Sequence, residues 1–439
     1  MTKLEIAIWS FPLLLVLILV RMPIGLAMLL LGLGGSILVN GSTVQVMSQM
    51  KSLPYDTFSN YSLSIIPLFL LMGQFATHGG LSKSIFSAVE SWLGHRKGGV
   101  AMASIGACAG FGAICGSSLA TAATMAQVAL PELRRYGYSG ALSTGALAAG
   151  GTLGILIPPS VVLVIYAILT EQNIAKLFVA AFIPGILAAI GYMITVAIYV
   201  RLKPDSAGTR PPAPMKERWT SLLSVWPVLV VFLAVVGGIY AGIFTPTEGA
   251  AVGAAGTGLI AFLNGGLTWP KLVTSLEQTA TSTAMIFFIV LGAALYNAFL
   301  AFAQLPQEAA VWVTEQGFAP LTVMVAILIF YLVLGCFMDS LSMILLTVPI
   351  FFPIVSGLDF GLSAEDFALW FGILVLIVVE VGLITPPVGM NLFIINSMAK
   401  DVPMGQTYRG AVPFILTDIV RVGILVAFPA ITLGLVWLL

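Results

Sequence analysis

Long apolar stretches separated by short polar segments run through almost the whole chain. A helix needs about 20 apolar residues to cross the hydrocarbon core of a membrane. Eight stretches meet this requirement as simple spans: 5–20, 24–40, 62–82, 176–200, 222–243, 250–266, 278–303 and 411–438. The pattern therefore predicts an all-α polytopic membrane protein.

Two further apolar blocks are too long for one straight span and carry a proline pair near the middle. They are residues 138–170, with Pro158-Pro159, and residues 364–398, with Pro386-Pro387. Proline removes a backbone donor and breaks a helix. Each block is expected to form one discontinuous helix.

Residues 99–135 and 321–358 contain small polar breaks at Gly116-Ser117-Ser118 and Met338-Asp339-Ser340. Basic residues flank the first block on both sides, so the positive-inside rule places both of its ends in the cytoplasm. The second block has acidic flanks and no nearby Lys or Arg, which suits the outside face. The blocks are predicted to be two re-entrant helical hairpins that enter from opposite faces.

The chain divides into two related halves. Residues 1–200 form the first predicted repeat, 201–219 a cytoplasmic linker, and 220–439 the second repeat. Ten spans and two hairpins place both termini outside and give the second copy the opposite orientation. Inverted repeats with broken helices are typical of secondary transporters, whose site lies at the repeat interface near the bilayer midplane.

Composition agrees with a membrane protein and excludes several other classes. Apolar residues make up 59% of the chain and charged residues 8%, with 18 basic and 18 acidic residues. A soluble domain does not have this balance. The zero net charge provides no basic patch for nucleic acid, so the expected surroundings are the lipid bilayer.

The breaks offer oxygen ligands for a hard cation such as sodium, because each hairpin tip faces an unwound proline segment. The first predicted sodium site consists of Ser117, Ser118, Gly154 and Pro158. The second consists of Asp339, Thr385, Pro387 and Gly389. Helix N-termini hold anions, and the predicted contacts to a substrate carboxylate lie at Ser118, Ser160 and Gly389.

Several of these residues also have structural readings. The serines could bond to helix carbonyls or help spans pack, whereas an acid at membrane depth such as Asp339 is a functional hypothesis by default. For Glu380, a structural hydrogen bond to the scaffold and a role in coupling stay open. Arg421 is expected to extend to the cytoplasmic surface.

Four motifs in order resemble the large membrane subunit of tripartite ATP-independent periplasmic (TRAP) transporters, DctM-like proteins of the elevator type. They are Gly116-Ser-Ser-Leu-Ala-Thr121, Gly154-Ile-Leu-Ile-Pro-Pro-Ser160, Gly335-Cys-Phe-Met-Asp339 and Glu380-Val-Gly-Leu-Ile-Thr-Pro-Pro-Val-Gly389. The resemblance covers essentially the whole chain.

The resemblance implies a multi-pass protein of a bacterial or archaeal inner membrane. It further implies a small four-helix membrane subunit, here a separate chain, and a periplasmic binding protein that delivers an organic acid. A C4-dicarboxylate, sialic acid or a related carboxylate is expected, and so is sodium as the coupling ion, with no other cofactor. The hairpin-bearing domain would then move like an elevator.

Three other functions compete with that of a TRAP permease. A stand-alone sodium/dicarboxylate symporter of similar fold is the first. An intramembrane serine protease using Ser117 or Ser118 would need a general base within reach, but His78 and His95 lie outside the motifs. A channel suits paired breaks of opposite orientation less well than alternating access does.

Overall fold

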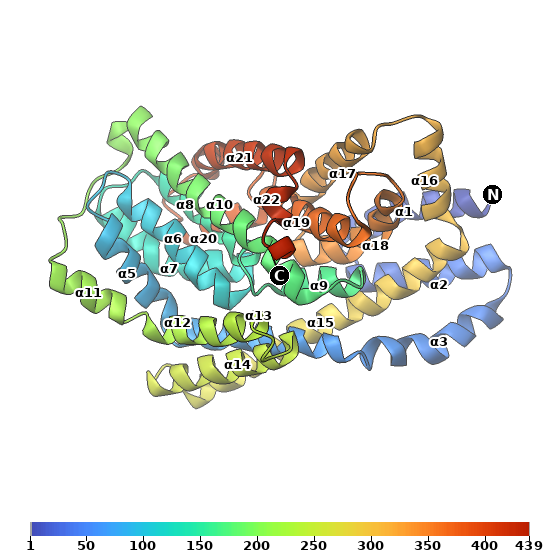
Figure 1. Ribbon diagram of the computed structural model, residues 1–439, viewed down its shortest axis with the longest axis horizontal. Helices are drawn as coiled ribbons and strands as arrows, with labels where there is room; N and C mark the ends of the chain where they lie inside the picture. The colour runs from blue at the N-terminus through green and yellow to red at the C-terminus, as the bar shows by residue number, and fades with distance from the viewer. Residues whose placement is uncertain (1, 439) are drawn as a thin grey trace.

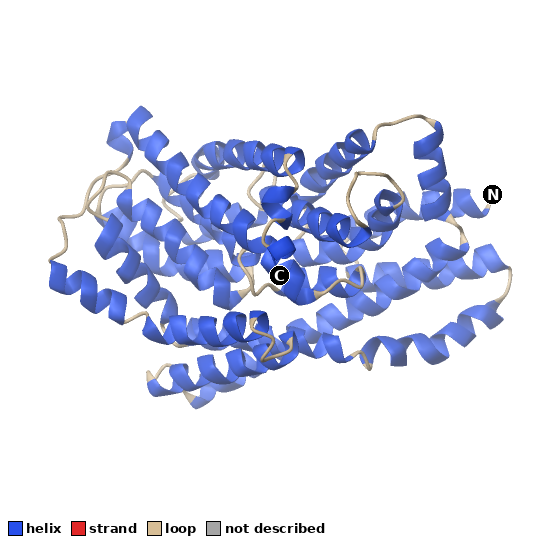
Figure 2. Ribbon diagram, in the orientation of Figure 1, coloured by secondary structure: helices blue, strands red, loops and turns tan. Residues whose placement is uncertain are grey.

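The computed structural model describes residues 2–438, and helices account for nearly all of that range, without a strand (Figure 2). Apolar helices and broken helix pairs make up the architecture. The predicted all-α membrane fold is therefore confirmed.

The first half of the chain begins with scaffold helices and continues through a hairpin and a broken helix. Its helices are α1 (Lys3–Leu19), α2 (Ile24–Asn40), α3 (Thr43–Phe58), η1 (Tyr61–Ser64), α4 (Ile65–His78), α5 (Leu81–Leu93), α6 (Gly99–Cys115), α7 (Ser118–Arg135), α8 (Gly140–Leu156), α9 (Val161–Leu169) and α10 (Ile174–Leu202).

The second half repeats this order after a connecting segment. Its helices are η2 (Pro204–Ser206), α11 (Met215–Leu223), α12 (Trp226–Phe232), the π-helical turn η3 (Leu233–Gly237), α13 (Gly238–Tyr240), α14 (Pro246–Leu263), α15 (Trp269–Phe302), α16 (Leu305–Glu315), α17 (Pro320–Gly335), α18 (Ser340–Ser356), α19 (Ala364–Gly382), α20 (Met390–Met398), α21 (Met404–Ala427), α22 (Ala430–Leu433) and η4 (Val436–Leu438).

Both predicted hairpins are present. Helices α6 and α7 pack against each other, as do α17 and α18. Each arm has 16 to 18 residues, which spans only about 24 to 27 Å at 1.5 Å per residue. Figure 1 shows the α6–α7 hairpin toward the left of the molecule and the α17–α18 hairpin toward the right. We call them hairpin 1 and hairpin 2.

The two discontinuous helices are also present. Helices α8 and α9 are bent by 46° at residues 157–160, where the proline pair lies. Helix α19 ends at Gly382, and α20 begins at Met390 after the second proline pair. We call residues 157–160 and 383–389 break 1 and break 2.

The scaffold helices of the two halves pack reciprocally. Helix α2 lies along α15, and α14, which has the same place in the second half, lies along α4. The contact is close: a Cβ atom added to Gly32 would lie 2.7 Å from the backbone nitrogen of Tyr296. In each case a scaffold helix of one half packs against a scaffold helix of the other half. Two copies related by a two-fold axis would pack in this way.

The packing of hairpins on broken helices is also equivalent in the two halves. The first arm of each hairpin packs on the broken helix of its own half, α6 on α8 and α17 on α19. The second arm packs on both halves, α7 against α8 and α20, and α18 against α19 and α9. The tips and breaks of both halves are thereby brought to the middle of the molecule.

Two differences from the sequence prediction concern α3 and the last predicted span. Between the predicted spans 24–40 and 62–82 the chain forms a further helix, α3 at Thr43–Phe58, bent by 50° relative to residues 61–78. Polar residues interrupt the apolar pattern of α3, so apolar length alone does not predict a helix there. The last predicted span, 411–438, is shifted: α21 covers Met404–Ala427, and the chain turns at Pro429.

Length and composition qualify four helices as single membrane spans, and two bent pairs raise the number to as many as six within the described residues. The four are Ile174–Leu202, Met215–Tyr240, Trp269–Phe302 and Met404–Ala427. The shorter apolar helices include the hairpin arms Gly99–Cys115, Pro320–Gly335 and Ser340–Ser356.

Arg421 corrects a further expectation. Its side chain does not reach the cytoplasmic surface but is buried on α21, where it pairs with Asp418 at 2.8 Å. The ring of Tyr192 on α10 lies beside the guanidinium, and its hydroxyl donates to Asp418 Oδ2 at 2.6 Å. An arginine alone favours a surface position, whereas the pairing with an aspartate one helical turn before it allows Arg421 to be buried.

The segment between the halves is held against α5. The Arg210 guanidinium lies 3.4 Å from Glu90 Oε2 on α5 and 2.5 Å from Glu217 Oε1 on α11. The indoles of Trp92 and Trp219 meet edge to face. The segment is thus fixed in the fold by both charge and aromatic contacts.

Candidate transport site between the hairpin tips

The tip of hairpin 1 is built by a glycine and a capping serine. Gly116 ends α6 with φ of +64°, a left-handed conformation that glycine adopts without strain. Ser117 then caps α7, because its hydroxyl accepts from the backbone N–H of Ala120 at 3.4 Å. The chain reverses direction within two residues.

Break 1 lies directly behind this tip. A Cβ atom added to Gly154 would lie 2.7 Å from the carbonyl oxygen of Ser117, and one added to Gly116 would lie 3.3 Å from that of Pro159. Ser160 is buried and caps α9, accepting from Leu163 N–H at 3.4 Å. The tip therefore packs closely, backbone to backbone, against α8 and break 1.

The second arm of hairpin 2 is capped in the same way, with an acid in place of the serine. Asp339 caps α18, and its Oδ2 accepts from Ser342 N–H at 3.0 Å. Break 2 is bonded directly to this tip, since Gly389 N–H donates to the carbonyl of Cys336 at 3.0 Å. Gly389 has φ of +68° and is the N-cap residue of α20.

The two tips meet at one cavity of about 240 Å³. Scaffold residues of α4 and α15 and the start of α9 complete its wall. The lining residues are Leu70, Gly116, Ser117, Ser118, Leu119, Ile155, Val161, Val162, Ser282, Met285, Ile286, Asp339, Ser340 and Leu341. The cavity thus joins both hairpins, one broken helix and the scaffold.

The predicted site residues fall into two groups around this cavity. Ser117, Ser118 and Asp339 line it. The others lie in the two breaks or in α8 and do not line it: Gly154, Pro158, Ser160, Thr385, Pro387 and Gly389. Their assignment as ligands stays a prediction.

Two oxygen atoms in break 2 already take part in one hydrogen bond each. The carbonyl of Pro387 accepts from the hydroxyl of Tyr408 on α21 at 2.5 Å. The hydroxyl of Thr385 donates to the Val381 carbonyl at 2.6 Å. Each oxygen keeps a lone pair that a cation could use.

The electrostatics of the cavity come from helix ends and one acid. Helices α7, α9 and α18 all begin at its wall, so the partial positive charge of three N-termini acts there. Its lining contains the carboxyl group of Asp339 and no Lys, Arg or His. Both signs of charge are therefore available, with the positive charge supplied by backbone.

Sequence reasoning missed Ser340 and Ser282. Ser340 holds the position in hairpin 2 that Ser118 holds in hairpin 1, the first residue of the second arm. Aligning the two repeats residue by residue at the tips would have identified it. Ser282 lies within α15 and has no break or motif beside it, so the sequence carries no comparable signal.

Glu380 occupies the centre of the arrangement. It is fully buried near the end of α19, and its Oε1 accepts from Ser340 Oγ at 2.5 Å and from Ser118 Oγ at 3.5 Å. Glu380 Oε2 and Asn391 Oδ1 belong to a larger set of buried side-chain atoms that have no hydrogen-bond partner in the described part of the chain. Buried oxygens in this state require a cation, a proton or water.

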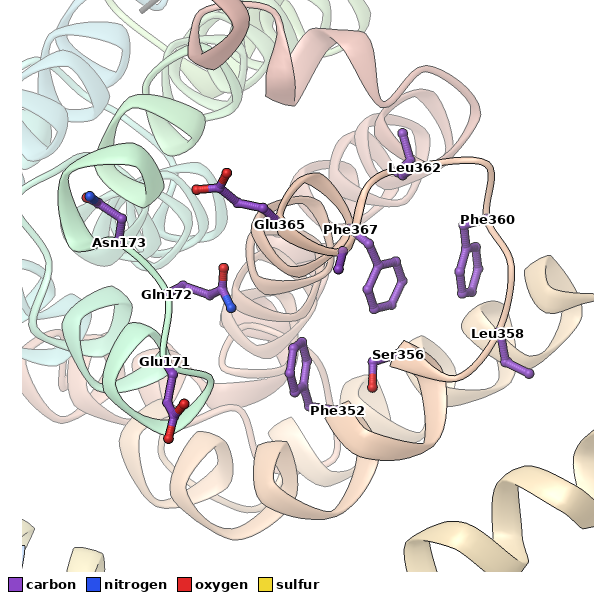
Figure 3. Close-up of a pocket in the computed structure, with 11 residues that line it drawn as sticks. Glu171, Gln172, Asn173, Phe352, Ser356, Leu358, Phe360, Leu362, Glu365 and Phe367 are labelled. Carbon is purple, nitrogen blue, oxygen red and sulfur yellow. The ribbon is translucent and has the colours of Figure 1, made fainter.

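A larger pocket of about 660 Å³ lies apart from the tips and breaks, between the α9–α10 turn and the α18–α19 turn. Figure 3 shows Phe352 and Phe367 with Gln172 and Glu365 around its opening. Lys176 pairs with Glu365 at 2.6 Å at its edge. No residue of the central cavity lines this pocket, so it is a separate feature.

Known proteins match the chain over most of its length. Residues 11–431 match the family described as tripartite ATP-independent periplasmic transporter, DctM component. A C4-dicarboxylate TRAP transporter large permease protein of Pseudomonas aeruginosa is 36% identical over 92% of this chain and 93% of that protein. A sialic acid TRAP transporter large permease protein of Vibrio cholerae is 31% identical over 94% of each.

Other matches extend the range of named substrates and show the fold. An ectoine TRAP transporter large permease protein of Halomonas elongata is 31% identical over 85% of this chain and 86% of that protein. The crystal structure of the Alcanivorax borkumensis YdaH transporter aligns with a TM-score of 0.62, over 87% of this chain and 88% of that chain, at 14% identity. From this agreement of motifs, fold and relatives, the chain belongs to the DctM family of TRAP transporter large permeases, which are inner-membrane proteins.

Proposed function

We propose that this chain is the sodium-coupled permease subunit of a TRAP transporter that imports a small organic acid. A periplasmic binding protein delivers the acid, and a small four-helix membrane subunit completes the complex. The observation that carries the proposal is the single cavity formed by both hairpin tips with both breaks directly behind them.

The charges around the cavity support co-transport of a cation with an anion. An organic acid at the cavity would be attracted to the N-termini of α7, α9 and α18 but repelled by the carboxylate of Asp339. A sodium ion held by tip and break carbonyls offsets that repulsion, because hard cations prefer oxygen ligands. Sodium and the acid would then bind together.

Cavity size supports a small substrate. Relatives are named for C4-dicarboxylates, sialic acid, ectoine and isethionate. A cavity of about 240 Å³ is smaller than the roughly 300 to 1,000 Å³ of most drug-sized ligand sites. A four-carbon dicarboxylate suits it better than the larger sugar acid.

The reciprocal packing supports alternating access by an elevator movement. Hairpins and broken helices pack mainly on each other. The scaffold helices form a second group, in which α2 lies along α15 and α14 lies along α4. Movement of the first group along the second would carry the cavity across the membrane. The tips would then move away from Ser282 and Met285, which stay with α15.

Uptake into proteoliposomes tests the proposal. With the small subunit and a substrate-loaded binding protein present, an inward sodium gradient should drive uptake, and Ser118→Ala and Asp339→Ala should each lower the rate at least about tenfold. Ser104→Ala is the matched control: its buried hydroxyl donates within α6 to Val100 at 2.9 Å, away from the tip.

Two results would contradict the proposal. Intact sodium-dependent uptake in both site variants would refute the site assignment. Full uptake without the binding protein or the small subunit would identify a stand-alone symporter instead.

A further inference from the structure

Glu380 stands out because its carboxyl group is fully buried within the apolar helix α19 and forms no ion pair among the described residues. It lies about one turn before break 2, near the C-terminal end of α19. None of the ion pairs within residues 2–438 includes it. Ionisable residues in such positions are expensive to bury and are usually retained for a function.

The contacts of Glu380 join the two hairpins. Its Oε1 accepts from Ser340 on hairpin 2 at 2.5 Å and lies 3.5 Å from the hydroxyl of Ser118 on hairpin 1. Both serines are the first residue of a second arm, and both line the central cavity. One oxygen atom of α19 thus holds two tips that reach the centre from opposite sides.

The direction of these hydrogen bonds limits what the serines can do. A serine hydroxyl has one proton to donate and two lone pairs that accept. While Ser118 and Ser340 donate to Glu380, neither has a proton left for a substrate carboxylate. Their oxygen lone pairs stay free, and these can coordinate a cation.

We propose that Glu380 is a positioning residue that fixes the hydroxyls of Ser118 and Ser340 as ligands for sodium. It therefore sets the affinity of the site for the coupling ion, and the organic acid binds elsewhere in the cavity, to backbone N–H groups. This inference rests on the sodium coupling proposed above.

Glu380→Gln isolates the charge, because glutamine has nearly the same shape. The amide is uncharged, and its NH₂ group can donate to the serine oxygens and occupy the lone pairs that sodium requires. The sodium concentration that gives half-maximal uptake should rise about tenfold or more, while uptake at saturating sodium stays near the wild-type rate. Glu90→Gln, on α5 and away from the cavity, should leave both values unchanged.

A second comparison asks whether Glu380 acts through the serines. In a Ser118→Ala/Ser340→Ala background, Glu380→Gln should add no further shift in the half-maximal sodium concentration. An equal shift with and without the serines would overturn the proposal, as would an unchanged sodium dependence in Glu380→Gln alone.

The test stays decisive if Glu380→Gln does not fold. Ser340→Ala and Ser118→Ala should then each raise the half-maximal sodium concentration, and Ser104→Ala should not. Unchanged values in both site variants would overturn the proposal. Wild-type uptake that does not respond to sodium would refute the proposed function itself, so the two failures can be told apart.

Discussion

Buried charges are the residues whose single loss should harm this molecule most. Arg421 and Asp418 lie in the layer formed by α8, α10 and α21, and Tyr192 contacts both. Removing one member of such a pair leaves an uncompensated charge, which costs about 3 to 5 kcal/mol, whereas an apolar replacement of both members is often tolerated.

Arg421→Met should therefore lower the thermal unfolding midpoint of the purified protein by several degrees. The double variant Asp418→Leu/Arg421→Met should recover part of that loss, because no buried charge remains. Thermal unfolding in detergent, followed by tryptophan fluorescence, gives both values. A double variant less stable than Arg421→Met would contradict this account.

The stability of the protein should depend on pH through Glu90, which lies on α5 at the predicted cytoplasmic side. Burial raises the pKa of its carboxyl group above the ordinary value of 4.5, more than the nearby Arg210 lowers it. The folded state therefore holds the proton more tightly than the unfolded state. The contribution of Glu90 to stability is greatest below pH 4.5 and is lost as the pH rises through the raised pKa.

Glu90→Gln removes this titration. Relative to wild type, the unfolding midpoint of the variant should rise steadily as the pH is increased from about 4.5. Parallel melting curves across a pH series provide the measurement. A difference that stays constant or falls with pH would show that Glu90 is not the titrating group.

At the scale of elements, the scaffold depends on close contacts between helices. Gly32 of α2 lies against the backbone of α15, where an added Cβ would approach the Leu295 carbonyl carbon and the Tyr296 nitrogen to 2.7 Å. Backbone cannot move aside as a flexible side chain can. Gly34 on the same helix has no atom within 4 Å of an added Cβ.

Gly32→Ala should reduce the yield of monodisperse protein and lower its unfolding midpoint, whereas Gly34→Ala should leave both unchanged or raise them slightly. The expected gain at Gly34 is up to about 1 kcal/mol from helix propensity. Size-exclusion chromatography and thermal unfolding of the two variants give the comparison. Equal behaviour of both variants would mean that α2 and α15 are not in close contact.

The sequence predicted the breaks well because they depend on local chemistry. Proline pairs, glycine and capping residues act within a few positions, so hairpins 1 and 2 and both broken helices were confirmed. Local chemistry also explains why α3 was not predicted. Its polar residues, including Lys51 and Gln49, make it resemble a loop when only apolar length is considered.

At the scale of the whole molecule, prediction from sequence failed where distant segments meet. Ser118 and Glu380 are 262 positions apart, and no local pattern indicates that they share a hydrogen bond. The burial of Arg421 likewise depends on α10 packing beside α21. Sequence could identify the tips, but only the packed structure shows that they meet at one carboxylate.

The central claim is that two hairpins entering from opposite faces form one site. A Ser118→Cys/Ser340→Cys variant tests it directly, in a background where Cys108, Cys115 and Cys336 are replaced by alanine. Because both hydroxyls contact the same oxygen atom of Glu380, a short bifunctional thiol reagent should link the two cysteines in membranes.

Mass spectrometry of the digested protein should find the peptides containing positions 118 and 340 joined, and a Ser104→Cys/Ser340→Cys control should remain unlinked. If both cysteines at the tips react singly with the reagent but never become joined, the tips do not meet, and the single shared site is wrong.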